Sequence, residues 1–571
     1  MANKAKLAAA LLLGSLGWAF YALSDYYSSL GLAYTAWDLL YGGLRLFTMS
    51  VLIPPGTATW SLKLAAILSP LAAMFTITVY AIIAAAALTG RLKWRLLRLK
   101  GQTVICGYGY LGRILARHYR RAGRPVVVIE LKNHDGWTEF QRDSGMTLIP
   151  GDAAGQGVLQ KARLEYAGSV VIVCGDEAAN LLVATAVAKY LGRVIPRSPV
   201  DCRLHLPHLD NGAAQGFLAV LDRQNPHLNI QGFDPDTVVA CGLLEKYPLD
   251  RETISEKSGV EVQLVLVGYN HFSKVLALAA AQTAHYANGR PPRLVFFDHP
   301  VEAEDEFRAR HPQAEEAARF VFTGLRLESQ AGRQALEEAA LDEGRLTTLV
   351  FCDEHPIRAF GQALLPPLSV REKAFTLVRA WDVERGALSE FLGKGEADFG
   401  LQLFGAYALD LGLALGVDDK ARIIHGYYAE KYPGGPNAGP WETLGLGAKQ
   451  SNRWQALHLS AKLRAVGCRL KPRNSVLYGD RVVKKGGFRD DEIETLARME
   501  HNRWQANRRL AGYKRGERDE RRLFHPDLLP YEDLAEDVKE KDRLFIKALP
   551  DLAERLGQVI VRSSGDSEKK P

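Results

Sequence analysis

The sequence is poor in cysteine and in the residue clusters that bind metals. Its 571 residues include only 6 cysteines, with no CxxC pair and no Cys/His cluster of zinc-site spacing. These absences argue against a disulfide framework and against a bound metal, and they favour a reducing compartment. An excess of one charge is also missing, because 72 basic residues stand against 65 acidic ones. This balance does not indicate nucleic acid as a partner.

The composition is otherwise that of a globular protein. Hydrophobic residues make up 47%, aromatic residues 9% and charged residues 24% of the chain, which argues against wholesale disorder and against a protein made mostly of apolar helices. A chain of this length exceeds what one hydrophobic core supports. We therefore expect three or four domains, most of them folding in water.

Charge is absent from two N-terminal stretches. Residues 7–24 and residues 64–90 contain no charged side chain, and both approach or exceed the roughly 20 residues that a membrane-spanning helix needs. The first stretch is also compatible with a secretory signal, but aromatic side chains such as Trp18 stand where a small-residue cleavage site would lie. The sequence predicts a transmembrane hairpin in residues 1–100.

A basic connector follows the second apolar stretch. Residues 91–100 contain five basic side chains and no acidic one, so the positive-inside rule places the N-terminus and the bulk of the chain in the cytoplasm. Residues 36–53 are apolar but interrupted by charge, which suits an interfacial or re-entrant segment better than a third crossing. A plain anchor and a pore hairpin both remain open at this point.

A glycine-rich motif comes directly after the connector. A short apolar strand at residues 103–106 leads into GxGxxG, and the next strand, at residues 125–130, ends in an acid. The first glycine permits a tight turn, the second lets the backbone approach a pyrophosphate, and the third lets helix and strand pack closely, while the acid accepts hydrogen bonds from a ribose. The residues assigned to nucleotide binding are Gly107, Gly109, Tyr110, Leu111, Gly112 and Glu130. The alternative is a fold that persists without its ligand.

Two further strands end in Gly-Asp pairs. Asp152 follows the strand at residues 147–150, and Asp176 follows the strand at residues 170–174. Parallel strands end at a common edge, where ligands of open α/β sheets bind. Both aspartates are therefore candidates for cofactor binding, although each is equally well explained as a helix N-cap.

The order of these features resembles a known family. A membrane hairpin, a basic connector and this Rossmann unit resemble the bacterial potassium-channel regulatory domains of the RCK, or TrkA-N, class. The resemblance implies a cytoplasmic domain that binds NAD(H) or an adenine nucleotide, in a protein of the bacterial inner membrane. The chain departs from the family in one respect: nothing between Asp25 and Lys63 matches a TVGYG-like potassium filter.

A second, degenerate copy of the unit follows. The strand at residues 262–267 runs into Gly268, but the second and third glycines are replaced, and His271 is interpreted as a helix-start residue rather than a catalyst. Further apolar strands alternate with polar helical stretches, which predicts a parallel doubly wound sheet. We expect Rossmann domains at residues 101–245 and 246–395, the second with a structural or assembly role. In the family it resembles, tandem domains assemble into rings, which implies a homo-oligomer.

From about residue 400 helical periodicity predicts an all-α domain, residues 400–560, with a polar, disordered tail at residues 561–571. The five residues Asn452–Ala456 recur as residues 502–506, which suggests an internal repeat. The motif order LAxxEHxRW, GY, HP, PY and DR resembles the ryanodine-receptor repeat, or RyR domain, whose bacterial members are thought to sense nucleotide-derived signals. Candidates for a pocket that binds an anion and a ring are His425, Trp441, Arg453, His501, Arg503 and Trp504. The alternative is that the rings pack the core and the arginines pair with acids such as Glu500.

Two functions fit these observations. The first is an oligomeric, ion-channel-like membrane protein for potassium or another cation, in which nucleotide ligands of the cytoplasmic domains gate the membrane hairpin. The second is a membrane-anchored nucleotide sensor or scaffold that conducts nothing. An oxidoreductase is a third and weaker hypothesis, because no pair of a histidine and a carboxylate that could relay a hydride reaction is evident beside the glycine loop. We expect no enzymatic activity and no catalytic residue.

Overall fold

The computed structural model divides the chain into two units, residues 1–100 and 101–571. The structure describes residues 2–50, 56–96, 101–131, 146–196, 198–206, 212–380, 400–405, 417–435, 437–477 and 479–562. The end of the predicted re-entrant segment, the end of the basic connector, most of residues 381–416 and nearly all of the predicted tail lie outside these ranges.

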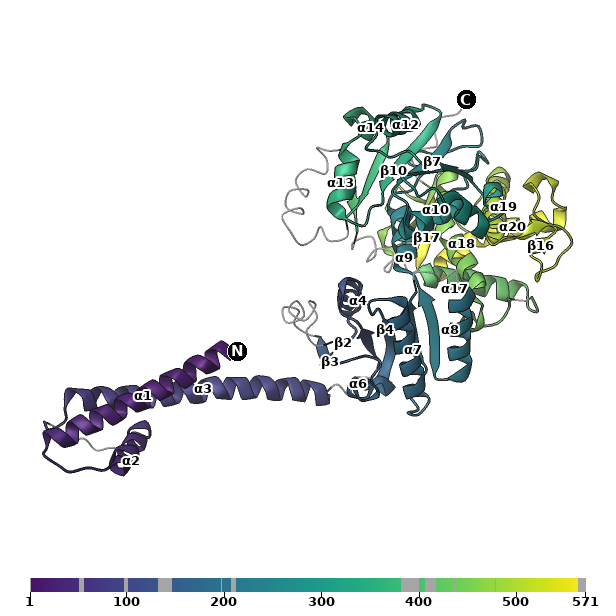
Figure 1. The fold of residues 1–571 in the computed structure, drawn as a ribbon. Helices are drawn as coiled ribbons and strands as arrows, with labels where there is room; N and C mark the ends of the chain where they lie inside the picture. Colours follow the sequence, from purple (N-terminus) through teal and green to yellow (C-terminus); the bar gives the residue numbers. More distant parts are fainter. Residues whose placement is uncertain are drawn as a thin grey trace. The chain divides into compact units, whose positions relative to one another are not determined.

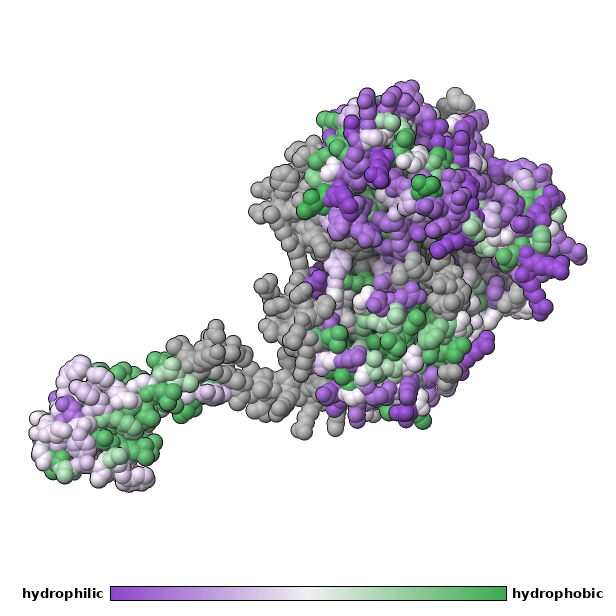
Figure 2. All heavy atoms as spheres, viewed as in Figure 1, coloured by the Kyte–Doolittle hydropathy of each residue, from purple (hydrophilic) through white to green (hydrophobic). Residues whose placement is uncertain are grey.

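The described residues of the N-terminal unit form three helices (Figure 1). The long helices α1 (Ala2–Ser29) and α3 (Trp60–Leu96) pack against each other, and the short α2 (Ala36–Phe47) packs against both. Two stretches, Ala8–Ser29 and Trp60–Ala81, are long and apolar enough to cross a membrane by length and composition. Large apolar side chains such as Ile67 and Ile77 are exposed on α3, and Figure 2 shows hydrophobic residues along this unit.

The first sheet has six parallel strands. In order across the sheet they are β3 (Thr147–Pro150), β2 (Val126–Glu130), β1 (Gln102–Cys106), β4 (Ala167–Ile172), β5 (Val200–His205) and β6 (Leu228–Phe233). The helices of this part are α4 (Tyr110–Arg121), α6 (Gln156–Lys161), α7 (Glu177–Leu191) and α8 (Gly212–Gln224). The strand order is that of a doubly wound Rossmann sheet. It puts the ends of β1 to β4, with their predicted site residues, at one edge.

The second sheet repeats this topology. Its parallel strands lie in the order β12 (Gln402–Phe404), β11 (Phe375–Arg379), β10 (Arg345–Phe351), β7 (Glu261–Val267), β8 (Arg293–Phe297) and β9 (Arg319–Phe322). Its helices are α10 (His271–Thr283), α11 (Ala303–Arg310), α12 (Gln330–Leu341), α13 (Pro356–Leu364) and α14 (Leu368–Lys373). The prediction of two tandem parallel sheets is confirmed.

One hydrophobic core joins the second sheet to the C-terminal region. Helix α9 (Pro235–Lys246), which follows β6, packs on α10, and the same core includes Trp454 and Ala461 of α18 (Leu446–Ala465) and Ala506 and Leu510 of α19 (Asp490–Leu510). Because this core is continuous, the second sheet and the C-terminal helices are expected to unfold together.

The prediction of an all-helical C-terminal domain is wrong. Besides α17 (Val417–Lys431), α18, α19 and α20 (Glu536–Arg555), the region contains a sheet in the order β13 (Cys468–Pro472), β17 (Gln558–Arg562) and β14 (Arg481–Val482). A two-stranded ladder, β15 (Lys514–Arg515) with β16 (Phe524–His525), adds to it. The short strands carry no long apolar run, so helical periodicity dominates the sequence signal, and β13 and β17 form their ladder across a separation of 90 residues.

The C-terminal region is an internal repeat. From the short 3₁₀ helix η4 (Trp441–Thr443) through α18 to β13, each element reappears 90 residues later as η6 (Tyr531–Asp533), α20 and β17. In the antiparallel β13–β17 ladder Leu470 faces Ile560, its own counterpart in the repeat. The two halves are therefore related by a local two-fold axis through this pair. The five residues shared by α18 and α19 lie on helices that are not equivalent in this repeat. The 50-residue repeat that they suggested is therefore wrong, because the structural repeat is 90 residues.

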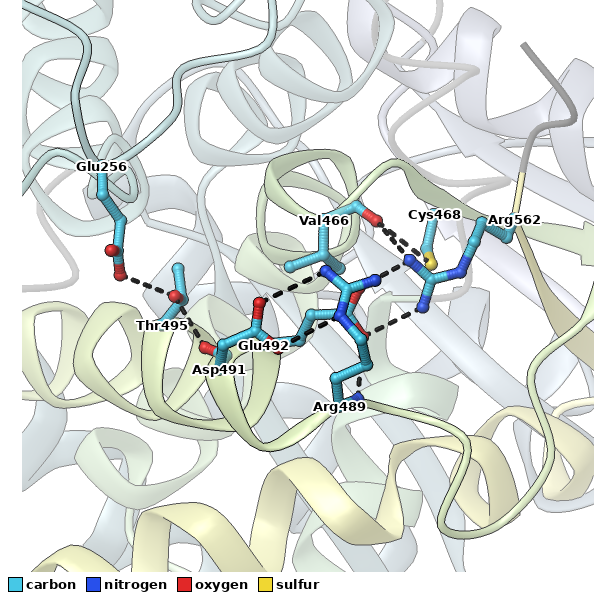
Figure 3. Close-up of polar contacts among 8 residues, drawn as sticks. All are labelled: Glu256, Val466, Cys468, Arg489, Asp491, Glu492, Thr495 and Arg562. Carbon is cyan, nitrogen blue, oxygen red and sulfur yellow. Dashed lines mark hydrogen bonds and ion pairs between the residues drawn. The ribbon is translucent and has the colours of Figure 1, made fainter. Parts of the chain in front are cut away.

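Ion pairs at the start of α19 hold this helix against β17 within the second half of the repeat (Figure 3). Arg562 of β17 donates to both oxygens of Glu492, at 2.6 and 3.0 Å, and the side chain of Glu492 is 3% exposed. The backbone N–H of Arg489, the N-cap residue of α19, donates to the same carboxylate at 2.9 Å. Burial opposes ionisation of Glu492, but these hydrogen bonds and the two guanidinium charges outweigh it and lower its pKa.

Candidate nucleotide site

The three glycines of the motif are in three different environments. Gly107 has φ +101°, and a Cβ there would lie 2.6 Å from the carbonyl oxygen of Val173 at the end of β4. A Cβ at Gly112 would lie 2.1 Å from the Gly107 carbonyl oxygen. A Cβ at Gly109 would meet no atom within 4 Å. The fold itself therefore requires glycine at 107 and 112, whereas the space above Gly109 is open.

The N-terminus of α4 is available to an anion. Gly109 is its N-cap residue and makes no side-chain capping bond, so the first amide N–H groups of the helix are not taken by a cap. Tyr110 and Leu111 occupy the first turn, and Leu111 packs against the core beneath. An uncapped helix N-terminus beside open space is the arrangement that binds phosphate groups.

Glu130 lies at the end of β2 and faces the glycine loop. It is 7% exposed, and its carboxylate accepts hydrogen bonds from the backbone N–H of Tyr108 and, at 2.9 Å, from that of Leu131. A carboxylate has about four lone-pair positions, and these contacts use two of them. Glu130 thus holds the loop in place and retains capacity for ribose hydroxyls.

The two aspartates differ in their local roles. Asp176 caps α7, accepting from the Ala179 N–H at 2.7 Å, as its N-cap alternative predicts. Asp152 accepts from the Ala154 N–H at 2.9 Å in a turn and does not cap α6, whose N-cap is Gly155. Helix capping therefore explains the position of Asp176 at the sheet edge but not that of Asp152.

Cys174 lies at the same edge, between the predicted site residues. Burial, reinforced by the negative charges of Glu130 and Asp152, raises its pKa to about 12. A thiol with this pKa is protonated at neutral pH. Cys174 is therefore a neutral thiol at this edge of the sheet.

The corresponding edge of the second sheet is filled by the protein's own side chains. Gly268 keeps a positive φ of +93°, but Asn270 takes the place of the second glycine. Its side chain accepts from the Ser273 N–H at 3.0 Å and donates to the Cys352 carbonyl at 2.6 Å, so α10 begins with a complete capping box. The start of α10 is therefore capped, unlike the start of α4.

One polar cluster was missed by sequence reasoning. Asp234, Asp236 and His271 bring one ligand atom each within 4.8 Å of one another. Asp234 caps α9 and contacts His271 Nε2 at 3.0 Å, while Asp236 pairs with Arg379 at 3.4 Å. Burial raises the pKa of Asp236 to about 6, although the positive charge of Arg379 opposes the shift. His271 is the first residue of α10, as predicted, and only the fold brings it to the end of β6.

The six C-terminal candidates divide between the two halves of the repeat. In the first half His425 Nε2 donates to the Gly439 carbonyl oxygen at 2.8 Å, and its ring lies 5.9 Å from that of Trp441. In the second half His501 makes the equivalent 2.8 Å contact with the Leu529 carbonyl, and its ring stacks on Trp504. Arg453 of α18 lies 3.3 Å from Gln450 Oε1.

Arg503 belongs to a buried ion cluster. Its side chain is 2% exposed and donates through Nε and Nη2 to Glu500, and the fully buried Lys462 lies 2.5 Å from the same carboxylate. This is the alternative in which arginine pairs with Glu500. Glu500 and Lys462 lie on different helices, so sequence spacing alone did not identify the cluster.

Residues 103–198 match the family model of the TrkA-N domain. The resemblance of the first Rossmann unit to this class is confirmed, and the glycine loop lies within the matched TrkA-N domain. Potassium channel protein 1 of Methanocaldococcus jannaschii is 28% identical over 95 residues, which cover 17% of this chain and 28% of that protein. A Trk system potassium uptake protein TrkA homolog of Pyrococcus horikoshii is 34% identical over 88 residues, covering 15% of this chain and 38% of that protein. The chain thus spans less than half the length of these curated relatives.

Solved structures give broader but weaker similarity. The GsuK channel bound to NAD aligns with a TM-score of 0.35 and 12% identity, over 83% of this chain and 87% of that one. GsuK bound to ADP aligns with a TM-score of 0.36 and 14% identity, over 72% of this chain and 96% of that one.

Proposed function

We propose that the chain is a nucleotide-regulated, ion-channel-like membrane protein. The observation that carries the proposal is the open, uncapped start of α4 above Gly109, inside a TrkA-N domain and followed by an acid at the end of β2. The ligand proposed for this site is NAD(H) or another adenine nucleotide, because Glu130 suits unmodified ribose hydroxyls better than a 2′-phosphate. No catalytic role is assigned to it.

The proposed output of this binding is gating of the membrane hairpin. The apolar lengths of α1 and α3 and the exposed apolar side chains of α3 support insertion in the cytoplasmic membrane, with the bulk of the chain in the cytoplasm. The potassium-related names of the curated relatives favour potassium or another cation. Nucleotide binding acts on the hairpin only through different affinities for its open and closed states.

A conducting form needs several copies, because two spanning helices cannot enclose a pore. A surface for such contacts is available on the first Rossmann domain, where Figure 2 shows hydrophobic side chains over α7 and α8. Leu182, Phe217 and Val220 are 65%, 36% and 51% exposed there, and Ile195 beyond α7 is 75% exposed. Exposed apolar patches of this kind mark association sites. We place the contact between copies on this face.

The C-terminal repeat is proposed as a second ligand-sensing input. Its resemblance to the RyR repeat implies a nucleotide-derived ligand, and its shared core with α9 and α10 links it physically to the second sheet. The Arg464 guanidinium donates to both oxygens of Asp250, at 2.7 and 2.9 Å, which fixes α18 to the chain segment after α9.

The second candidate function is a membrane-anchored nucleotide sensor or scaffold that conducts no ions. The signal it relays could serve in defence. One observation favours it: residues 25–63 contain no TVGYG-like filter sequence. A sensor of this kind needs the same nucleotide site and the same anchor but no pore.

Ion flux separates the two candidates. Purified full-length protein in liposomes is tested for potassium and sodium flux with and without NAD, NADH and ADP. Ligand-dependent flux that is lost in Gly109→Val supports the channel, since this variant fills the open space above the loop. Nucleotide binding without flux under any ligand supports the scaffold. Nucleotide binding that survives Gly109→Val contradicts the assigned site in both cases.

A further inference from the structure

Four side chains from separate elements lie near the point where β6 runs into α9. Asp234 follows β6, Asp236 lies in the first turn of α9, and His271 is the first residue of α10. One ligand atom of each of these three lies within 4.8 Å of the others. His205 ends β5 and is paired with Phe233, the residue before Asp234. The cluster therefore joins the first sheet, the connecting helix α9 and the first helix of the second sheet.

The two carboxylates are held in place and keep acceptor capacity. Asp234 is 6% exposed; its Oδ1 accepts from the Asp236 N–H at 3.0 Å, and its Oδ2 accepts from the Thr237 hydroxyl at 2.9 Å. The side chain of Asp236 is 17% exposed, and the only hydrogen-bond or ion-pair partner of its carboxylate in the described part of the chain is Arg379, at 3.4 Å from Oδ1. Hydrogen bonds that orient a carboxylate in this way are typical of the outer shell of a metal site.

The spacing of the ligand atoms fits a small cation. His271 Nε2 and Asp234 Oδ2 lie 3.0 Å apart. With metal bonds of about 2.1 Å, two ligands at right angles lie about 3 Å apart and two opposite ligands about 4.2 Å apart. The widest pair of the cluster, within 4.8 Å, thus needs to close by about 0.6 Å or less. Small side-chain rotations are sufficient for this change.

His205 supplies a second imidazole. Burial lowers its pKa, and the charges of Asp234 and His271 also act on that pKa, so the ring lies close to the cluster. Its ring nitrogens make no hydrogen bond in the described part of the chain, and the ring packs against Phe233 with 6.0 Å between centroids. Imidazole suits first-row transition metals, whereas Ca²⁺ and Mg²⁺ prefer oxygen ligands. The ligand set therefore favours a transition metal.

The charge of the cluster also suits a cation. Arg379 is 7% exposed and compensates one of the two carboxylates. With both histidines neutral, one net negative charge remains. Buried charge of this kind is costly unless it is paired or coordinates a metal.

We propose that His205, Asp234, Asp236 and His271 bind a divalent first-row transition metal ion such as Zn²⁺ or Mn²⁺. Sequence reasoning predicted no bound metal, because these ligands come from four elements and show no motif spacing. A bound ion fixes the start of α9 to β5 and α10. Because α9 and α10 share one core with Ile114 of α4, the ion stabilises the packing between the two sheets. The proposal does not depend on nucleotide binding at the glycine loop.

The test uses full-length protein in lipid nanodiscs after a chelator has removed bound metals. Zn²⁺, Mn²⁺, Mg²⁺ and Ca²⁺ are titrated separately by calorimetry, and hydrogen exchange locates the protection. We expect Zn²⁺ or Mn²⁺ to bind more tightly than Mg²⁺ and Ca²⁺ and to slow exchange at the starts of α9 and α10. Asp236→Asn and His271→Gln should each weaken this binding about tenfold or more, because even changes in the outer shell cost about 10-fold to 100-fold in metal affinity.

The matched controls lie at the opposite edge of the first sheet. Asp201→Asn, near the amino end of β5, and His227→Gln, directly before β6, make the same substitutions and should leave metal affinity unchanged. Both site variants keep a hydrogen-bonding group at the substituted position, and hydrogen exchange of β6 without metal checks that they are folded. The site is overturned if the wild type binds neither Zn²⁺ nor Mn²⁺, if either site variant binds as tightly as the wild type, or if protection lies elsewhere. Binding of Ca²⁺ or Mg²⁺ as tight as that of Zn²⁺ and Mn²⁺ overturns the assigned class of metal.

Discussion

The glycine loop separates residues required by the fold from residues required by the ligand. Gly107→Ala puts a methyl group 2.6 Å from a backbone oxygen at a residue with φ +101°. The strained conformation costs about 1–2 kcal/mol, and the overlap adds about 1–3 kcal/mol. The expected loss of local stability is therefore about 2–5 kcal/mol. Gly109→Val meets open space at φ −62°, so its effect on stability should lie within about 0.5 kcal/mol.

The effects on binding should not follow the effects on stability. The Gly109→Val side chain would occupy the position proposed for a phosphate in front of α4. Losing the charge-assisted hydrogen bonds of one phosphate costs about 1.5–3 kcal/mol, which corresponds to about tenfold to 150-fold in affinity. Gly107→Ala should also weaken nucleotide binding, but it should do so by destabilising the glycine loop.

Hydrogen exchange and calorimetry measure both quantities on the full-length protein. A loss of 2 kcal/mol speeds exchange about 30-fold in the unit that opens, and we expect this acceleration in β1 and α4 for Gly107→Ala alone. NAD or ADP affinity should fall in both variants. The reasoning is refuted if Gly109→Val accelerates exchange as much as Gly107→Ala, or if Gly109→Val binds the nucleotide as tightly as the wild type.

Three further predictions concern single groups. Glu500→Gln leaves Lys462 and Arg503 buried without their shared carboxylate and should cost about 3–5 kcal/mol in chemical denaturation, whereas the exposed Glu540→Gln should cost less than about 1 kcal/mol. Glu492→Gln should lower the free energy of unfolding by about 1–3 kcal/mol at pH 7. The folded state lowers the pKa of Glu492, so this loss of stability should be present above the ordinary pKa of glutamate. It should disappear as the pH falls through the pKa of Glu492 in the folded state. Cys174, with a pKa of about 12, should be about 10⁻⁴ thiolate at pH 8, and maleimide labelling as fast as at a free cysteine would contradict its burial.

Local patterns predicted the first Rossmann unit because every signal lies within about 30 residues. These signals are the strand before Gly107, the spacing to Gly112 and the acid at the end of β2. They lie close together in the sequence, and the structure contains each of them. Strands β5 and β6 were not predicted. Buried positions alternate with exposed ones in β5 and with half-buried ones in β6, so these strands lack the continuous apolar run of a central strand.

The C-terminal region shows what sequence patterns did not reveal. The echo of five residues suggested a repeat of 50, but the repeat in the structure is 90 residues over η4, α18 and β13 and is carried by few identical side chains. The ladder that defines the two-fold axis pairs Leu470 with Ile560, a contact with no local signal. The burial of Arg503 likewise depends on Lys462 from another helix, so its role follows only from packing.

The position of α9 gives the two sensing regions a common element. The helix follows β6 directly, begins at its cap Asp234, and packs on α10, which in turn contacts α18 and α19. His458 of α18 contacts the His285 carbonyl after α10 at 2.8 Å, and both histidines are buried. Close-packed cores of this kind shift between discrete arrangements rather than deform gradually. Under the proposed function, a ligand that favours one arrangement of the C-terminal repeat would act on the segment joining the two sheets. By reciprocity, a nucleotide at the glycine loop would then change the affinity of the repeat for its ligand by the same factor.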